Sequence, residues 1–137
     1  MPIGYSPKLP LSISSVDGPY ALTKTQQEMI RQNLKNLVLT SPGERIMDPE
    51  FGVGIRSFLF EQKTEIVQSE IRERIYRQVN IYLPFVEILG ILFGRAEDLS
   101  QDPLSSIVDS DENLLSLSIV FRIKPLNVES SLTINLR

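Results

Sequence analysis

The spacing of apolar residues changes once along the chain, at Pro84, and this change constrains the fold more than any other feature. Before Pro84, in residues 25–39 and again after Thr64, the apolar residues recur every three or four positions, which is typical of helices with one buried face. After Pro84 they form a continuous run and later alternate with polar residues, which is typical of strands. Helices followed by strands predict an α+β fold, with two main helices packed on a small, mainly antiparallel, three-stranded sheet.

Capping residues and helix breakers set the limits of the two helices. The first is predicted at about residues 25–39, because Thr25 and Glu28 have the spacing of a capping box and a Ser-Pro-Gly sequence follows. The second begins after Thr64, an N-cap residue, and runs to Pro84. Its outer face carries two acid-first pairs four residues apart, Glu70 with Arg74 and Glu73 with Arg77.

Three strands are predicted after Pro84. Residues 85–93 are nearly all apolar, which suggests a strand covered on both faces, with Gly90 at a bulge or a close approach. Residues 115–123 alternate cleanly, as a half-buried antiparallel strand does. Residues 131–137 also alternate, and a turn at Asn127 would fold them back as a hairpin with an exposed edge.

The first twenty residues are predicted to form an extended, proline-rich arm. Four of the nine prolines fall there, and they prevent a helix. Large apolar residues lie between these prolines, so the arm is expected to lie along either a partner or its own domain. Residues 21–137 have the length of one ordinary domain, and a single α+β domain is predicted for them.

The composition excludes several kinds of chemistry. Without cysteine or histidine, the chain lacks thiolate nucleophiles, metal sites with Cys or His ligands, and serine–histidine catalysis, and we expect no cofactor and no metal. The net charge is −3, and residues 95–113 hold six acids against one base. The other bases are scattered among acids, so nucleic acid is not an expected partner. No apolar run reaches the roughly 18 residues of a membrane span, so no membrane is expected either.

Residues 41–61 combine three turn signals with charges and large apolar groups, without any periodic pattern. Such a segment is predicted to hold one specific shape and to fill the seam between the helices and the sheet. Gly52 and Gly54 would give freedom for a turn into a short helix, rather than form a nucleotide-binding loop, which needs a third glycine and a parallel βαβ unit. Its apolar side chains are expected to be buried: Ile46, Met47, Phe51, Ile55, Phe58, Leu59 and Phe60.

The same segment resembles the phage baseplate wedge and tail-sheath initiator family. The resemblance rests on Gly43-Glu44-Arg45, Pro49, Phe51-Gly52, Ile55 and Phe58-Leu59-Phe60-Glu61, and it covers roughly residues 20–137. It implies a structural subunit of a contractile phage tail baseplate, present in several copies around a hexameric baseplate. The implied partners are other wedge proteins and the tail-sheath protein, with tube or hub proteins as further candidates. The implied location is the virion tail, after assembly in the host cytoplasm.

Two surfaces are predicted to carry this function. The family resemblance favours docking through residues around the first turn: Glu44, Arg45, Pro49, Glu50, Phe51, Gly52 and Arg56. Sheath polymerisation would begin by β-augmentation, in which an extended arm of the sheath pairs with the C-terminal strands. The residues assigned to this pairing are Leu117, Ile119, Phe121, Leu132, Thr133, Ile134, Asn135 and Leu136.

Two alternatives remain open at this point. The resembled family is often labelled as lysozyme, and Glu44 or Glu61 could serve a peptidoglycan-cleaving tail enzyme. Against this, the chain has no tryptophan and only four tyrosines for a sugar-binding cleft. The other alternative is an adaptor of a related contractile injection machine, which would use the same surfaces.

Overall fold

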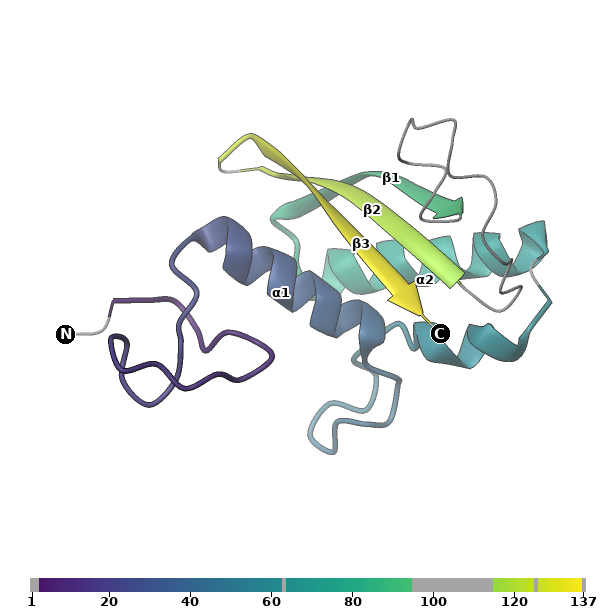
Figure 1. Ribbon diagram of the computed structural model, residues 1–137. Coiled ribbons are helices and arrows are strands. Elements are labelled where there is room, and N and C mark those ends of the chain that lie inside the picture. The colour runs from purple at the N-terminus through teal and green to yellow at the C-terminus, as the bar shows by residue number, and fades with distance from the viewer. Residues whose placement is uncertain (1–2, 63, 95–114, 125, 137) are drawn as a thin grey trace, which may run out of the picture.

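The computed structural model describes residues 3–62, 64–94, 115–124 and 126–136, and it confirms the predicted α+β fold. The element order is α1 (Gln26–Leu39), the short 3-10 helix η1 (Ile55–Phe60), α2 (Glu65–Tyr82), β1 (Val86–Gly94), β2 (Leu115–Ile123) and β3 (Val128–Leu136). Helices α1 and α2 lie against the same face of the sheet, with α2 along β1 and α1 along β3 (Figure 1). The acidic segment 95–113 lies outside the described residues.

Side-chain caps begin both helices where the sequence predicts them. The Thr25 hydroxyl accepts the Glu28 N–H at 3.2 Å, and the Thr64 hydroxyl accepts the Val67 N–H at 3.4 Å. The Glu28 carboxylate, however, accepts the N–H of Lys24, one residue before the cap, rather than an N–H of the first turn. Both predicted ion pairs on α2 are present at 2.8 Å, Glu70 with Arg74 and Glu73 with Arg77.

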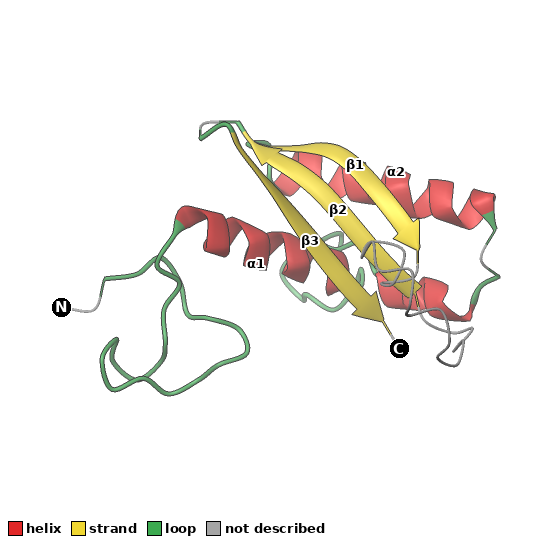
Figure 2. Ribbon diagram, turned by 45° about the horizontal axis from the view of Figure 1, so that its top comes forward, coloured by secondary structure: helices red, strands yellow, loops and turns green. Residues whose placement is uncertain are grey.

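The sheet is antiparallel throughout and has the order β1-β2-β3 (Figure 2). The register between β1 and β2 shifts between Ile88 and Gly90, which makes the predicted irregularity at Gly90 a bulge. Asn127 has a φ of 49°, and it lies in the turn that joins β2 to β3. Strand β3 begins at Val128, three residues earlier than predicted.

The covering of the strands differs from the prediction in two places. Leu89 and Leu92 of β1 are 42% and 52% exposed, so the prediction that this strand is covered on both faces was wrong. An apolar run does not by itself require a second layer, because one face of an antiparallel sheet can remain in water. Strand β2 is more covered than predicted. A half-buried strand was expected, but Ser116 and Ser118 are buried as well as the apolar face.

One hydrophobic core joins the helices to the sheet. The predicted apolar stripes of α1 and α2 and the alternate residues of β2 and β3 all face it, as the helical period and the strand period require. The side chains that are less than 2% exposed are Leu34, Leu37, Val38, Val53, Ile55, Ile71, Ile75, Val79, Leu117, Ile119, Phe121 and Ile123.

The described part of the N-terminal arm doubles back on itself and lies beside α1 (Figure 1). The Tyr5 N–H donates to the Thr23 carbonyl at 3.0 Å, and the Lys8 N–H donates to the Ala21 carbonyl at 2.8 Å. Thr23 is only 2% exposed, so the returning chain is anchored there. The division of the chain at residue 20 remains a prediction.

Candidate functional site

A loop of residues 41–54 leads from the end of α1 into η1, and backbone hydrogen bonds hold it in place. The Val53 and Gly54 N–H groups donate to the carbonyls of Leu37 and Thr40, at 3.0 and 2.9 Å. The Gly43 N–H donates to the Pro49 carbonyl at 2.8 Å and so closes the base of the loop tip, residues 43–49. The tip therefore projects from a base that is fixed to the last turn of α1.

Gly52 is required where the loop passes α1. Its φ is 113°, and a Cβ placed on it would lie 2.2 Å from the Thr40 carbonyl oxygen. The Gly52 N–H donates to the Gln78 Oε1 at 3.0 Å, while the Gln78 Nε2 donates to the Glu50 carbonyl at 2.9 Å. The side-chain amide of Gln78 thus holds residues 50–52 against α2. Both helices therefore fix the position of the loop.

An aromatic pair beneath the loop positions the charge of Arg45. Phe51 is buried and meets the ring of Tyr82 edge to face, with 4.8 Å between ring centroids. The Tyr82 hydroxyl donates to the Asp48 carboxylate at 3.0 Å, and this hydrogen bond raises the pKa of Tyr82. The Arg45 guanidinium carbon lies 3.6 Å above the centre of the Phe51 ring, which is a cation–π arrangement. Arg45 therefore has a fixed direction although it is exposed.

These groups border a hollow of about 210 Å³. The loop contributes Arg45 and Phe51, and α2 contributes Tyr82. The remaining lining comes from Asn33, Asn36, Leu37 and Leu83. Its amide, guanidinium and aromatic groups can hold a polar side chain of a neighbouring protein by hydrogen bonds and an ion pair.

The tip of the loop presents apolar side chains to solvent. Ile46 and Met47 are 94% and 96% exposed, and Phe60 at the end of η1 is 96% exposed. The prediction that these three are buried was wrong, whereas Phe51, Ile55 and Phe58 are buried as predicted, and Leu59 is half-buried. Ile46 and Met47 lie between Gly43 and Pro49, whose backbone groups close the base of the loop.

The structure brings together some of the predicted docking residues and separates others. Arg45, Phe51 and Gly52, with the backbone of Pro49 and Glu50, lie around Gln78 and Tyr82 of α2. The side chains of Glu44 and Arg56 are exposed. Sequence reasoning missed Gln78, Asp48 and the partner role of Tyr82, although Gln78 and Tyr82 stand four residues apart on one helix face.

The predicted pairing surface is reduced to one strand. Leu117, Ile119 and Phe121 lie on β2, whose two edges are already paired with β1 and β3, so they offer no edge to another chain. On β3, Thr133 and Asn135 are exposed, while Leu132, Ile134 and Leu136 are buried in the core. Within the described residues no other strand pairs with the outer edge of β3.

The two candidate catalytic acids lie on the surface of the protein. Glu44 and Glu61 are both exposed, and neither lines the hollow beside Arg45. A glycosidase acid typically lies in an apolar pocket, whereas both of these side chains are exposed. Among the residues that the structure describes, no cluster of acids could hold a metal ion. No described helix has both the length and the apolar character needed to cross a membrane.

The solved structures similar to this chain include a crystal structure and a baseplate structure. One is the crystal structure of a Geobacter sulfurreducens protein described as a candidate tail lysozyme, which is 21% identical with a TM-score of 0.65. The match covers 85% of this chain and 94% of that one. The other belongs to the baseplate of the anti-feeding prophage, is 24% identical with a TM-score of 0.63, and is matched over 85% of this chain and 82% of that one. At these identities the similarity shows a shared fold.

The family is shown by sequence. No curated protein sequence matches the chain significantly. Residues 24–127, however, match the sequence pattern of the family described as baseplate wedge protein gp25, and this match includes α1, the loop, η1, α2, β1 and β2. The match covers more than half of the chain, so the protein belongs to the baseplate wedge protein gp25 family.

Proposed function

We propose that the protein is a structural subunit of a contractile tail baseplate that docks on the wedge core and starts tail-sheath polymerisation. Membership of the baseplate wedge family and the fold shared with a prophage baseplate support the assignment to a baseplate. We infer a location in the tail of a phage or of a prophage-derived particle, with several copies around a hexameric baseplate. Docking and sheath initiation are assigned to different parts of the chain, the loop tip and the β3 edge.

The exposed apolar tip of the loop carries the docking proposal. Ile46 and Met47 are almost fully exposed, yet the loop behind them is held by Gly52, Gln78 and its own closing bond. A fixed loop loses little conformational freedom when it binds, so burying these side chains in a partner adds directly to affinity. Arg45, stacked on Phe51 beside the hollow, would add a directed charge to the same contact.

Replacing Ile46 and Met47 together with serine is expected to weaken binding to the wedge proteins by about a hundredfold or more, because two large apolar contacts are lost. The free energy of unfolding should change by less than about 0.5 kcal/mol, because both side chains are exposed in the free protein. Co-purification with wedge proteins and urea denaturation measure the two effects.

The matched control replaces Ile13 and Val16 with serine, since these are 90% and 86% exposed and lie on the N-terminal segment. That pair should leave wedge binding unchanged. Equal binding by the loop variant and the control variant would contradict docking through the loop tip.

The free edge of β3 carries the sheath proposal. Its backbone N–H and C=O groups on the outer side have no partner strand within the described residues, and such edges readily accept another chain. Main-chain pairing would supply affinity, while alternate side chains would set the register. The first sheath ring would thereby extend a sheet that begins in the baseplate.

A single-cysteine crosslink tests this pairing, because the natural chain contains no cysteine. Asn135→Cys, on the exposed face of β3, is labelled with a thiol-reactive benzophenone and irradiated during assembly with baseplate and sheath proteins. We expect a crosslink to the sheath protein, because an added strand lies about 5 Å from β3.

Asn80→Cys is the control, since Asn80 is exposed on α2. It should give no sheath crosslink. A sheath crosslink from Asn80→Cys alone would assign the sheath contact to the helical face instead.

A further inference from the structure

A second hollow, of about 410 Å³, runs beside the β3 edge. It lies between three parts of the chain: the N-terminal segment, one face of α1 and the middle of β3. We call it the edge groove, and its lining residues are Lys8, Leu9, Pro10, Thr23, Glu28, Arg31, Gln32, Lys35, Asn36, Leu132 and Thr133. The groove therefore lies where the next strand of the sheet would have to enter.

The α1 wall of the edge groove is basic. Glu28, Arg31 and Lys35 recur at helical spacing, so they share one face of α1. Glu28 already has an ion-pair partner, because the Lys8 ammonium lies 3.8 Å from the Glu28 carboxylate. Arg31 and Lys35 are exposed and form no ion pair with any residue that the structure describes. Three bases and one acid thus give the groove a positive field.

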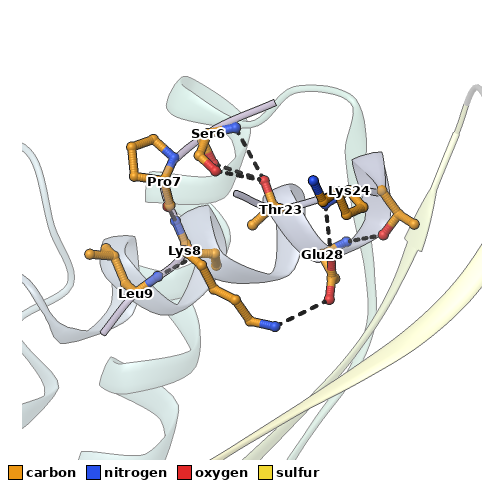
Figure 3. A network of polar contacts seen from close by, with 9 residues as sticks. Ser6, Pro7, Lys8, Leu9, Thr23, Lys24 and Glu28 are labelled. Atoms are coloured by element: carbon orange, nitrogen blue, oxygen red, sulfur yellow. Dashed lines mark hydrogen bonds and ion pairs between the residues drawn. The ribbon is translucent and has the colours of Figure 1, made fainter. Parts of the chain in front are cut away.

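The N-terminal wall is fixed to α1 rather than loosely placed. The Gln32 Oε1 accepts the Leu9 N–H, and the Gln32 Nε2 donates to the Pro7 carbonyl, both at 2.9 Å. The Ser6 N–H donates to the Thr23 hydroxyl at 3.2 Å, in the network that joins the two passes of the segment (Figure 3). The same view shows Lys8 reaching across to Glu28 at the start of α1. The N-terminal segment is therefore a fixed wall of the edge groove.

We propose that the edge groove selects an acidic extended segment, which pairs with β3 while its carboxylates face Arg31 and Lys35. The inference rests on the proposed β-augmentation and adds the chemistry of the partner strand. Alternate residues of a strand lie about 6.7 Å apart on one face. Residues four apart on a helix rise about 6 Å along its axis. Because α1 and β3 run in the same general direction, two alternate carboxylates can meet both bases (Figure 1, Figure 2).

Two peptides of about ten residues test this selection, one alternating threonine with glutamate and one alternating threonine with lysine. Each is titrated into the isotope-labelled full chain while the backbone amide signals are followed by NMR. We expect the glutamate peptide to shift the amides of residues 131–135 and to bind at least about fivefold more tightly than the lysine peptide. This preference should decrease as the salt concentration rises, because exposed charges are screened.

Charge reversal identifies the responsible residues. Arg31→Glu and Lys35→Glu should each weaken the glutamate peptide by about fivefold, and the double variant should favour the lysine peptide. Lys124→Glu is the matched control, because Lys124 is exposed and does not line the groove, and it should not change binding. Circular dichroism checks that each variant remains folded.

The outcomes separate this inference from the proposed function. Equal shifts of the β3 amides by both peptides would overturn the selection of acidic strands and leave strand pairing intact. If the glutamate peptide and inorganic phosphate shift only Arg31 and Lys35, and not β3, the groove is a simple anion site and the inference fails. If neither peptide shifts the β3 amides, the inference also fails, and the Asn135→Cys crosslink then decides independently whether sheath pairing stands.

Discussion

Deletion of residues 131–137 is expected to unfold the protein rather than merely to block sheath assembly. The deletion removes three core side chains, Leu132, Ile134 and Leu136, which are 4%, 4% and 7% exposed. Truncating one buried leucine or isoleucine to alanine costs about 2–5 kcal/mol. Three such losses reach the total stability of a domain this size, about 5–15 kcal/mol. Far-UV circular dichroism and urea denaturation should therefore show no cooperative transition.

The control for this deletion keeps the core and changes only the exposed side of β3. Ser131 and Asn135 are exposed, so replacing both with alanine should cost less than about 1 kcal/mol. A deleted protein that still unfolds cooperatively, with the midpoint of the intact chain, would mean that β3 is not part of the core. Because β3 serves both the core and the proposed pairing edge, deletion cannot separate the two roles, whereas a label at residue 135 can.

Gly52→Ala is expected to destabilise the protein by about 3 kcal/mol or more. Two causes act together at this position. The φ of 113° lies in a region that L residues rarely adopt, and the new methyl group would lie 2.2 Å from the Thr40 carbonyl oxygen. Relief of this clash requires the loop to move away from α1, which also disturbs the bonds between Gly52, Gln78 and Glu50. Urea denaturation measures the loss of stability.

Gly43→Ala is the matched control for the clash. Gly43 also has a positive φ, of 92°, but a Cβ there meets nothing within 4 Å. Gly43→Ala should lower the free energy of unfolding only by the backbone strain, about 1–2 kcal/mol. The difference between the two variants therefore reports the contact with Thr40. Equal losses would mean that the loop passes α1 with more room than the structure shows.

Local sequence signals predicted the elements well, for identifiable reasons. Thr25 and Thr64 begin the helices because a hydroxyl can satisfy a free N–H within three residues along the chain. Asn127 turns the β2–β3 hairpin because asparagine tolerates a positive φ. The apolar periods assigned Ile71, Ile75 and Val79 to the buried face of α2. Each of these signals acts over a few residues, so the sequence alone can show it.

The candidate site was less predictable, because it depends on contacts between distant segments. Residues 41–61 were expected to fill a seam with all their apolar side chains, but the structure divides them between the core and the solvent. What separates Phe51 from Ile46 and Met47 is the position of Tyr82 and Gln78, about thirty residues later in the chain. No periodic pattern within the segment carries that information.

By itself, the sequence determined that this protein has two capped helices followed by three strands, and that its most unusual segment resembles a baseplate wedge family. Only the tertiary structure decided that β2 occupies the centre of the sheet, that a basic groove lies beside the outer edge of β3, and that Ile46 and Met47 face solvent. The physical reason is the range of the interactions involved. Caps, turns and periods are local, whereas exposure and edge position depend on which distant segments pack together.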